Sequence, residues 1–216
     1  MNERPLRILI EEEYDLRSGQ PDDVILAELQ SLPILPDEDI RVGHRFLTNP
    51  HWDDPYIRKQ LAIYLAIADL VYERKLRAAV PLLLERASYG DMGETMRGLR
   101  HSLEAAYHPD WDDLNAVCLK MAQSPHNGAR LWAIDELGIL RNPDSVPTLL
   151  QALRDSMDRV REQAVSSLKM LCYEHPDIQT EVIQALQELL KEFPDNQKDV
   201  QDALKAIQKQ QDDASD

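Results

Sequence analysis

The sequence predicts an all-α fold, a right-handed α-solenoid (superhelix) built from antiparallel helix pairs. Two internal repeats are the main evidence. The segment 129–137 shares its apolar positions and an arginine with 160–168, and the offset is constant along the match. The run at 149–153 recurs at 182–186, at nearly the same offset. Similarity at a period of about 30–40 residues, with two helical patterns in each unit, is typical of stacked two-helix repeats.

Composition supports helices and limits the classes of function. Hydrophobic residues make up 43% of the 216 residues, enough for a buried core, and there are only 7 glycines. A formal net charge of −15 repels phosphate backbones, so nucleic-acid binding is not expected as the main activity. The same charge attracts a basic protein surface, or simply keeps the chain soluble.

Pro-Asp pairs mark the expected helix boundaries. Proline disfavours helix in the residue before it and is accepted in the first helical turn, and aspartate caps free backbone amides. Between these marks the apolar residues follow helical spacing, for example in 61–71, 131–140 and 182–190. The pairs begin at Pro21, Pro36, Pro109, Pro143, Pro176 and Pro194, and Asp54-Pro55 is expected to act in the same way, with Asp54 as the cap.

The domain organisation follows from how well each segment fits the repeat. Residues 51–208 are predicted to form the repeats, and Val80-Pro81 matches Val146-Pro147, which lies close to two repeat units further along the chain. Residues 1–50 fit poorly and are expected to form an atypical N-terminal helical cap, in which 6–10 fit either helix or strand. Residues 209–216 are expected to be a disordered acidic tail.

The cysteines and the N-terminus indicate the cell compartment. Cys118 and Cys172 lie in apolar helical runs, which favours buried free thiols in a reducing compartment. Residues 1–10 include Glu3, Arg4, Pro5 and Arg7, unlike a signal peptide, and the apolar run 61–71 is too short to span a membrane. We therefore expect a soluble cytoplasmic protein that does not bind membranes.

The run from 129 to 164 contains Ala129-Arg130, Leu137-Gly138, Asn142-Pro143-Asp144, Val146-Pro147 and Val160-Arg161. This pattern resembles the short HEAT-like repeat found in bilin lyases of phycobilisome-containing organisms and in many bacterial scaffold proteins. The resemblance implies that first helices line the convex side and second helices the concave side. It also implies a structural ladder in which Arg130, Arg161 and, more weakly, Arg58 pair with acceptors such as Asp144 and Asp155.

No residue pattern predicts catalysis, a metal site or a cofactor. The sequence has no His-Glu dipeptide, and His101 and His108 fit a helix end or turn better than a metal site. Two similar segments, Trp52-Asp53 and Trp111-Asp112, begin helices. They fit either a local staple, with tryptophan packed on its own helix, or an aromatic anchor for a protein partner. Other partner-binding candidates, on the expected concave face, are Gln151, Arg154, Gln184 and Glu188.

The function expected from these observations is a non-enzymatic scaffold or adaptor that binds another protein through its concave face or the Trp/Asp rim. Two alternatives stay open. The resemblance allows a bilin lyase subunit or phycobiliprotein chaperone, which would handle a linear tetrapyrrole. The charge allows an acidic immunity-type inhibitor of a basic toxin.

Overall fold

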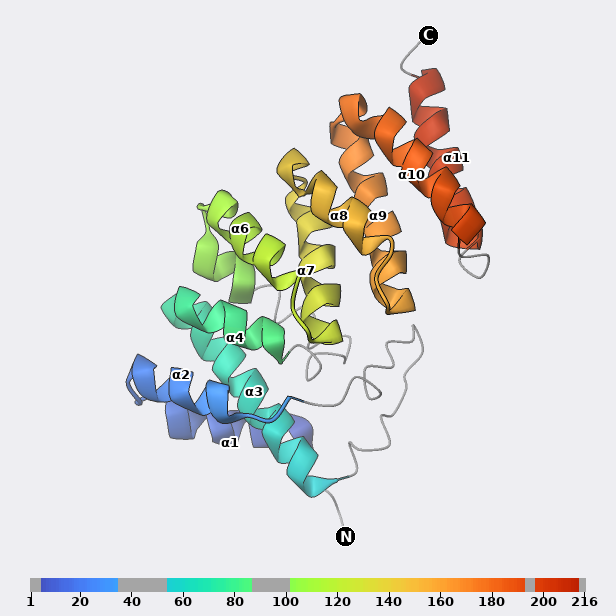
Figure 1. Ribbon diagram of the computed structural model, residues 1–216. Helices are drawn as coiled ribbons and strands as arrows, with labels where there is room; N and C mark the ends of the chain where they lie inside the picture. The colour runs from blue at the N-terminus through green and yellow to red at the C-terminus, as the bar shows by residue number, and fades with distance from the viewer. Residues whose placement is uncertain (1–4, 35–53, 87–101, 193–196, 214–216) are drawn as a thin grey trace. The chain divides into compact units, whose positions relative to one another are not determined.

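The computed structural model describes residues 5–34, 54–86, 102–192 and 197–213, and within these ranges the regular structure is entirely helical (Figure 1). The chain divides into two compact units, residues 1–114 and 115–216, with the division inside helix α6. No helix in the described ranges combines the length and the apolar character needed to cross a membrane.

Unit 1 is built around the long helix α3, and helix α1 packs along it. The Tyr64 hydroxyl, buried in the core, donates to the Leu83 carbonyl oxygen at 3.1 Å and so ties α3 to α4. Residues 102–107 are also helical. The named elements are α1 Leu6–Arg17, α2 Asp22–Ser31, α3 Pro55–Arg74, the 3₁₀ turn η3 Arg77–Ala79, α4 Val80–Glu85 and the start of α6 Trp111–Met121.

An ion pair network joins the first two helices. Arg17 is buried on α1 and donates to Glu13 one turn earlier at 2.5 Å, and to Glu28 of α2 at 2.7 and 2.5 Å. A planar guanidinium bound on both sides in this way fixes the angle between helices better than a single contact would.

Unit 2 contains the repeats in regular form, and Figure 1 shows its helices lying side by side. Helix α7 packs along α9, and α9 along α11, while α8 lies against α9. The elements after α6 are α7 Asn127–Leu140, η5 Pro143–Ser145, α8 Val146–Ala152, α9 Asp158–Glu174, η6 Pro176–Ile178, α10 Gln179–Glu192 and α11 Gln197–Asp213.

The apolar residues shared by 129–137 and 160–168 belong to the core of unit 2. All are fully buried, because equivalent helices bury equivalent faces against their neighbours. These residues are Ala129, Ala133, Leu137, Val160, Ala164 and Leu168. The prediction of an all-α fold with stacked helix pairs is confirmed in the described residues, and the right-handed sense stays a prediction.

The sequence match between 80–81 and 146–147 also appears in the backbone. Helices α3 and α7 both end at a residue in the left-handed region, Lys75 with φ 53° and Arg141 with φ 51°. Each is followed by a 3₁₀ turn and then by a second helix with proline in its first turn, Pro81 or Pro147. The left-handed residue ends the first helix and turns the chain back.

Capping differs from the expectation at the Pro-Asp pairs. Asp22 lies inside the first turn of α2, after Pro21 at the cap position, and Asn142 rather than Asp144 caps η5 by accepting from the Asp144 N–H at 2.9 Å. An aspartate that follows the proline already lies in the first helical turn, where its negative charge interacts favourably with the helix dipole. Asp54 caps as expected, accepting from the Tyr56 N–H at 2.8 Å. The pairs at 36–37 and 194–195 lie outside the described residues.

Residues 6–10, which fit either helix or strand in the sequence, are helical. Helices α1 and α2 belong to the same compact unit as α3. The division into an N-terminal cap, repeats and a tail stays a prediction. Helix α11 continues to Asp213, with the Gln210 side chain donating to the Tyr173 carbonyl oxygen at 3.1 Å, so the helix includes the start of the expected tail. Trp132 on α7 is buried in the core, with 3% of its surface exposed.

Candidate functional site

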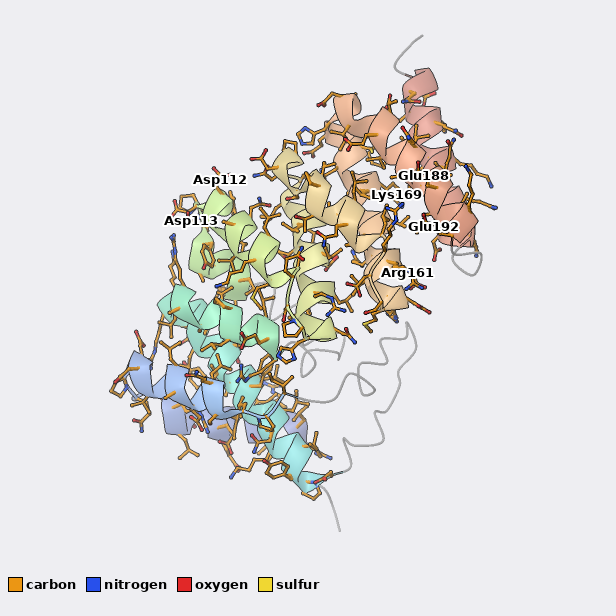
Figure 2. All side chains as sticks on the ribbon, in the orientation of Figure 1. Asp112, Asp113, Arg161, Lys169, Glu188 and Glu192 are labelled. Atoms are coloured by element: carbon orange, nitrogen blue, oxygen red, sulfur yellow. The ribbon has the colours of Figure 1, made fainter. Side chains whose placement is uncertain are left out.

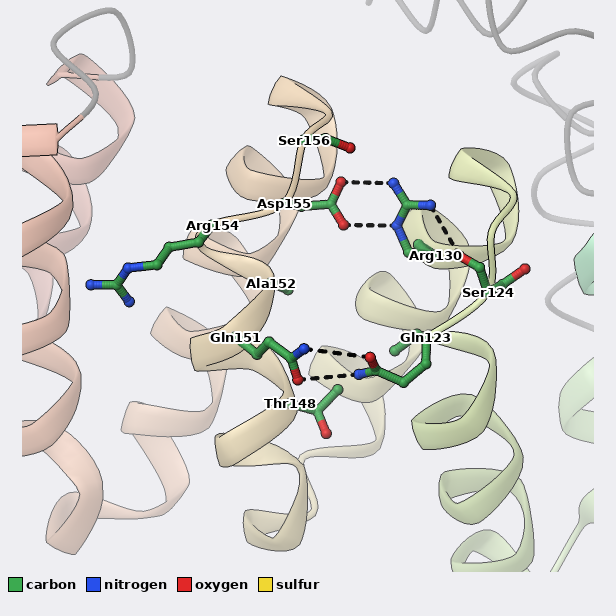
Figure 3. A pocket seen from close by; sticks show the side chains of 10 residues that line it. Gln123, Ser124, Arg130, Thr148, Gln151, Ala152, Arg154, Asp155 and Ser156 are labelled. Atoms are coloured by element: carbon green, nitrogen blue, oxygen red, sulfur yellow. Dashed lines mark hydrogen bonds and ion pairs between the residues drawn. The ribbon is translucent and has the colours of Figure 1, made fainter.

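A polar groove of about 540 Å³ opens on unit 2 between two consecutive repeats (Figure 3). Its walls come from the turn between α6 and α7 and from the first turn of α7 on one side, and from α8 and the turn into α9 on the other. The lining residues are Ala122, Gln123, Ser124, Arg130, Thr148, Gln151, Ala152, Arg154, Asp155 and Ser156.

Arg130 and Asp155 bridge the groove with a two-pronged ion pair. Arg130 Nε lies 2.7 Å from Asp155 Oδ2, and Nη2 lies 2.8 Å from Oδ1. Both side chains are only 12% exposed. Arg130 also donates to the Ser124 carbonyl oxygen and to Asn127 Oδ1, so one guanidinium fixes the turns of two repeats.

The electrostatics of Asp155 reflect this arrangement. Burial by itself would raise the pKa of the Asp155 carboxyl, but the hydrogen bonds from Arg130 and from the Met157 N–H, together with the charges of Arg130 and Arg161, hold it below the usual range. The ion pair is therefore intact at neutral pH and forms a fixed part of the groove.

Gln123 and Gln151 form a second bridge across the groove, seen below the ion pair in Figure 3. Each side-chain amide donates to the other, with nitrogen–oxygen distances of 3.3 and 3.4 Å. Both residues are exposed. The bonds are longer than the usual distance of about 2.9–3.0 Å and open to water, so this bridge is much weaker than the ion pair.

At the outer edge, Arg154 points away from the groove towards α10. It lies 3.2 Å from one oxygen of Glu192 and 3.5 Å from Glu188, and Gln184 donates to Glu188 at 3.4 Å. Figure 2 labels Glu188 and Glu192 on α10. The Arg154 side chain is 46% exposed, and pairs of this kind contribute little to stability. Arg154, Glu188 and Glu192 can therefore give up these ion pairs and bind charged groups of a ligand instead.

The predicted ladder residues are placed as follows. Arg161 is buried on α9 and donates to the Asp155 carbonyl oxygen at 2.8 Å and to Asp158 Oδ1 at 2.5 Å. Asp144, expected as an acceptor, lies exposed in η5. Arg58 is half-buried on α3. Arg130 and Asp155 are thus the expected Arg–Asp pair that the structure brings together.

The Trp/Asp segment at 111–112 lies at the start of α6. Trp111 is 39% exposed and meets the His108 ring edge-on, with centroids 5.4 Å apart. The neighbouring Asp110 and Asp113 bind Arg77, which leaves Asp112 exposed in the first turn. This segment is not among the groove's lining residues. Trp52, Asp53 and His101 lie outside the described residues.

The described residues place no group of three or more histidine, cysteine or acidic side chains where it would hold a metal ion. Both cysteines are buried with free thiols. Burial, and secondarily the charge of Glu136, raises the pKa of Cys118, and burial raises the pKa of Cys172 to about 12. Both thiols stay protonated near neutral pH and are poor nucleophiles.

Only part of the site was predicted from the sequence. Gln151 and Arg154 were expected and line the groove, while Gln123, Ser124, Ser156 and Glu192 were not expected. The sequence did contain a sign of the two serines, because the separation of Ser124 from Ser156 is close to the repeat period. The prediction placed binding on the second helices, whereas these serines lie in turns.

Comparison with known proteins agrees with this architecture. Residues 114–208 match the family described as HEAT repeats, a range that includes α7 to α10 and the whole groove. No curated protein and no solved structure matches the chain significantly. All residues that line the groove lie within this matched range.

Proposed function

We propose that the chain is a non-enzymatic scaffold that binds a protein partner, and that the groove of unit 2 is a principal contact. The observation that carries the proposal is the position of the groove within the HEAT repeats, open to solvent and lined by side chains from two consecutive repeats. Stacked repeats generate continuous surfaces of this kind, which such proteins use for binding.

The chemistry of the lining supports binding. The ion pair of Arg130 and Asp155 gives a rigid floor, while the amides of Gln123 and Gln151 and the guanidinium of Arg154 are exposed and weakly held. Rigid positioning groups beside exchangeable donors and acceptors let a surface bind a partner at little reorganisation cost.

Affinity capture from native extract tests the proposal. The immobilised wild type is compared with the groove variant Gln151→Ala/Arg154→Ala and with Gln208→Ala/Lys209→Ala, a matched pair exposed on α11. We expect mass spectrometry to find proteins retained by wild type and by the α11 variant but reduced at least about tenfold on the groove variant. Equal retention by all three, with unchanged circular dichroism, would refute the groove as the contact.

Trp111 and Asp112 are proposed as a second, separate contact, because Trp111 is exposed and tryptophan is frequent among binding hot spots. Adding Trp111→Ala to the same capture experiment tests it.

The bilin-lyase alternative rests on the resemblance alone and stays a prediction. Its test is the absorbance of a linear tetrapyrrole mixed with the chain, where an unchanged spectrum argues against it.

A further inference from the structure

We infer that the groove binds the main chain of an extended peptide segment, whose peptide groups replace the mutual hydrogen bonds of Gln123 and Gln151. The inference rests on the proposed function and adds the chemical class of what is bound. Each glutamine amide presents one carbonyl acceptor and an NH₂ donor, the same groups that a peptide bond offers. Two peptide groups of a partner, one at each glutamine, can therefore replace both hydrogen bonds without leaving a polar group unpaired.

The relative strength of the two bridges decides which one opens. The hydrogen bonds between the two glutamine side chains, at 3.3 and 3.4 Å, are long and exposed. The Arg130–Asp155 contacts, at 2.7 and 2.8 Å, are largely buried and charge-assisted. Replacing the amide bridge costs little, and breaking the buried ion pair costs much more. A ligand entering the groove is expected to separate the glutamines and leave the ion pair in place.

The charge balance of the lining favours an uncharged ligand backbone. The charge of Arg130 is matched by Asp155, and that of Arg154 is more than offset by Glu188 and Glu192, which lie outside the lining and leave one excess negative charge beside the groove. The remaining lining groups are the hydroxyls of Ser124, Thr148 and Ser156 and two alanines. Neutral donors and acceptors beside small side chains match a polypeptide main chain better than a phosphate or a carboxylate.

The test begins with selection of binders from a random phage-displayed peptide library on the full chain. The enriched peptide is synthesised unmodified and with single N-methylated peptide bonds. Its affinity is measured for wild type, for Gln123→Ala/Gln151→Ala, for the longer-chained Gln123→Met/Gln151→Met, and for Gln208→Ala/Lys209→Ala as the control.

We expect both glutamine variants to bind about tenfold more weakly, and the control to bind as wild type does. One N-methylation should weaken binding to wild type about tenfold but have little further effect on the glutamine variants, because the contact is already lost there. The side-chain NH₂ signals of Gln123 and Gln151 should also shift on binding in ¹⁵N-edited NMR spectra.

The inference is overturned if no peptide is enriched, if the glutamine variants bind like wild type, or if N-methylation weakens wild type and variants equally. These outcomes are separable from failure of the proposed function. One combination of results would separate them. If Gln151→Ala/Arg154→Ala loses extract proteins but the glutamine variants bind the peptide as wild type does, the scaffold proposal stands and main-chain recognition is refuted.

Discussion

Gly138 on α7 lies where the neighbouring helix α9 approaches closely. A Cβ atom added there would lie 2.4 Å from Ser167 Oγ and 2.8 Å from Ser167 Cα. Ser167 is itself held, since its hydroxyl donates to the Ile134 carbonyl oxygen at 2.9 Å. The glycine permits close approach of two backbones, and its conformational freedom is not what the position requires.

Gly138→Ala is therefore expected to destabilise the protein by about 2 kcal/mol. Overpacking typically costs about 1–3 kcal/mol, and the contact with the Ser167 backbone favours the upper end of that range. Alanine offsets roughly 1 kcal/mol of this cost because it is a better helix former than glycine. Urea denaturation measures the change. Gly19→Ala is the control, because nothing lies within 4 Å of its added Cβ. A Gly138→Ala protein as stable as wild type would show that the helices separate freely.

Asp155 gives a prediction for pH. At pH 7, Asp155→Asn is expected to cost about 2–4 kcal/mol, because it leaves the largely buried Arg130 without its anion. The pKa of Asp155 is lowered in the fold, so this stabilisation is complete above the ordinary carboxyl pKa of 3.8 and is lost as pH falls below it. The difference in unfolding free energy between wild type and variant should therefore shrink as the pH falls below 3.8.

Urea denaturation at pH 7, 5, 4 and 3 measures that difference. Asp144→Asn, exposed in η5, is the control and should change the unfolding free energy by less than about 0.5 kcal/mol at each pH. A pH-independent difference for Asp155→Asn would mean that the carboxylate charge contributes nothing.

At the scale of elements, the same helix ending occurs after α3 and after α7. Lys75 and Arg141 both adopt positive φ, which costs a residue with a Cβ roughly 1 kcal/mol relative to glycine. The ending is nevertheless kept at both equivalent positions, because the chain must reverse there for the second helix to pack.

Lys75→Gly is expected to stabilise unit 1 by about 0.5–1 kcal/mol, since glycine adopts this backbone conformation without strain. Lys59→Gly, exposed within α3, is the opposite case and should destabilise by about 1 kcal/mol. Thermal and urea denaturation of both variants measure the contrast. Equal destabilisation by the two substitutions would show that the end of α3 is not limited by backbone strain.

The sequence predicted those features that each repeat must carry for itself. Ala129, Ala133 and Leu137 recur at the repeat period because every unit buries the same face, and that periodicity is visible without a structure. The bridge between Gln123 and Gln151 was not predictable in this way. It depends on how a turn of one repeat meets the second helix of the next, and tertiary register sets that meeting.

For the whole molecule, the excess of 39 acidic over 24 basic residues sets long-range behaviour. A net charge of −15 attracts a basic partner over roughly a Debye length, about 10 Å at 0.1 M salt. Steering of this kind acts on the association rate, whereas close contacts such as those of the groove act mainly on dissociation.

If the captured partner is basic, raising NaCl from about 20 to 300 mM is expected to lower its association rate constant at least about tenfold, with little change in dissociation. Asp199→Asn/Asp202→Asn on α11 removes two charges and should slow association at low salt only. Gln123→Ala/Gln151→Ala should instead raise the dissociation rate at every salt concentration. Stopped-flow fluorescence separates the two effects, and an association rate independent of salt would rule out steering and with it the acidic-inhibitor alternative.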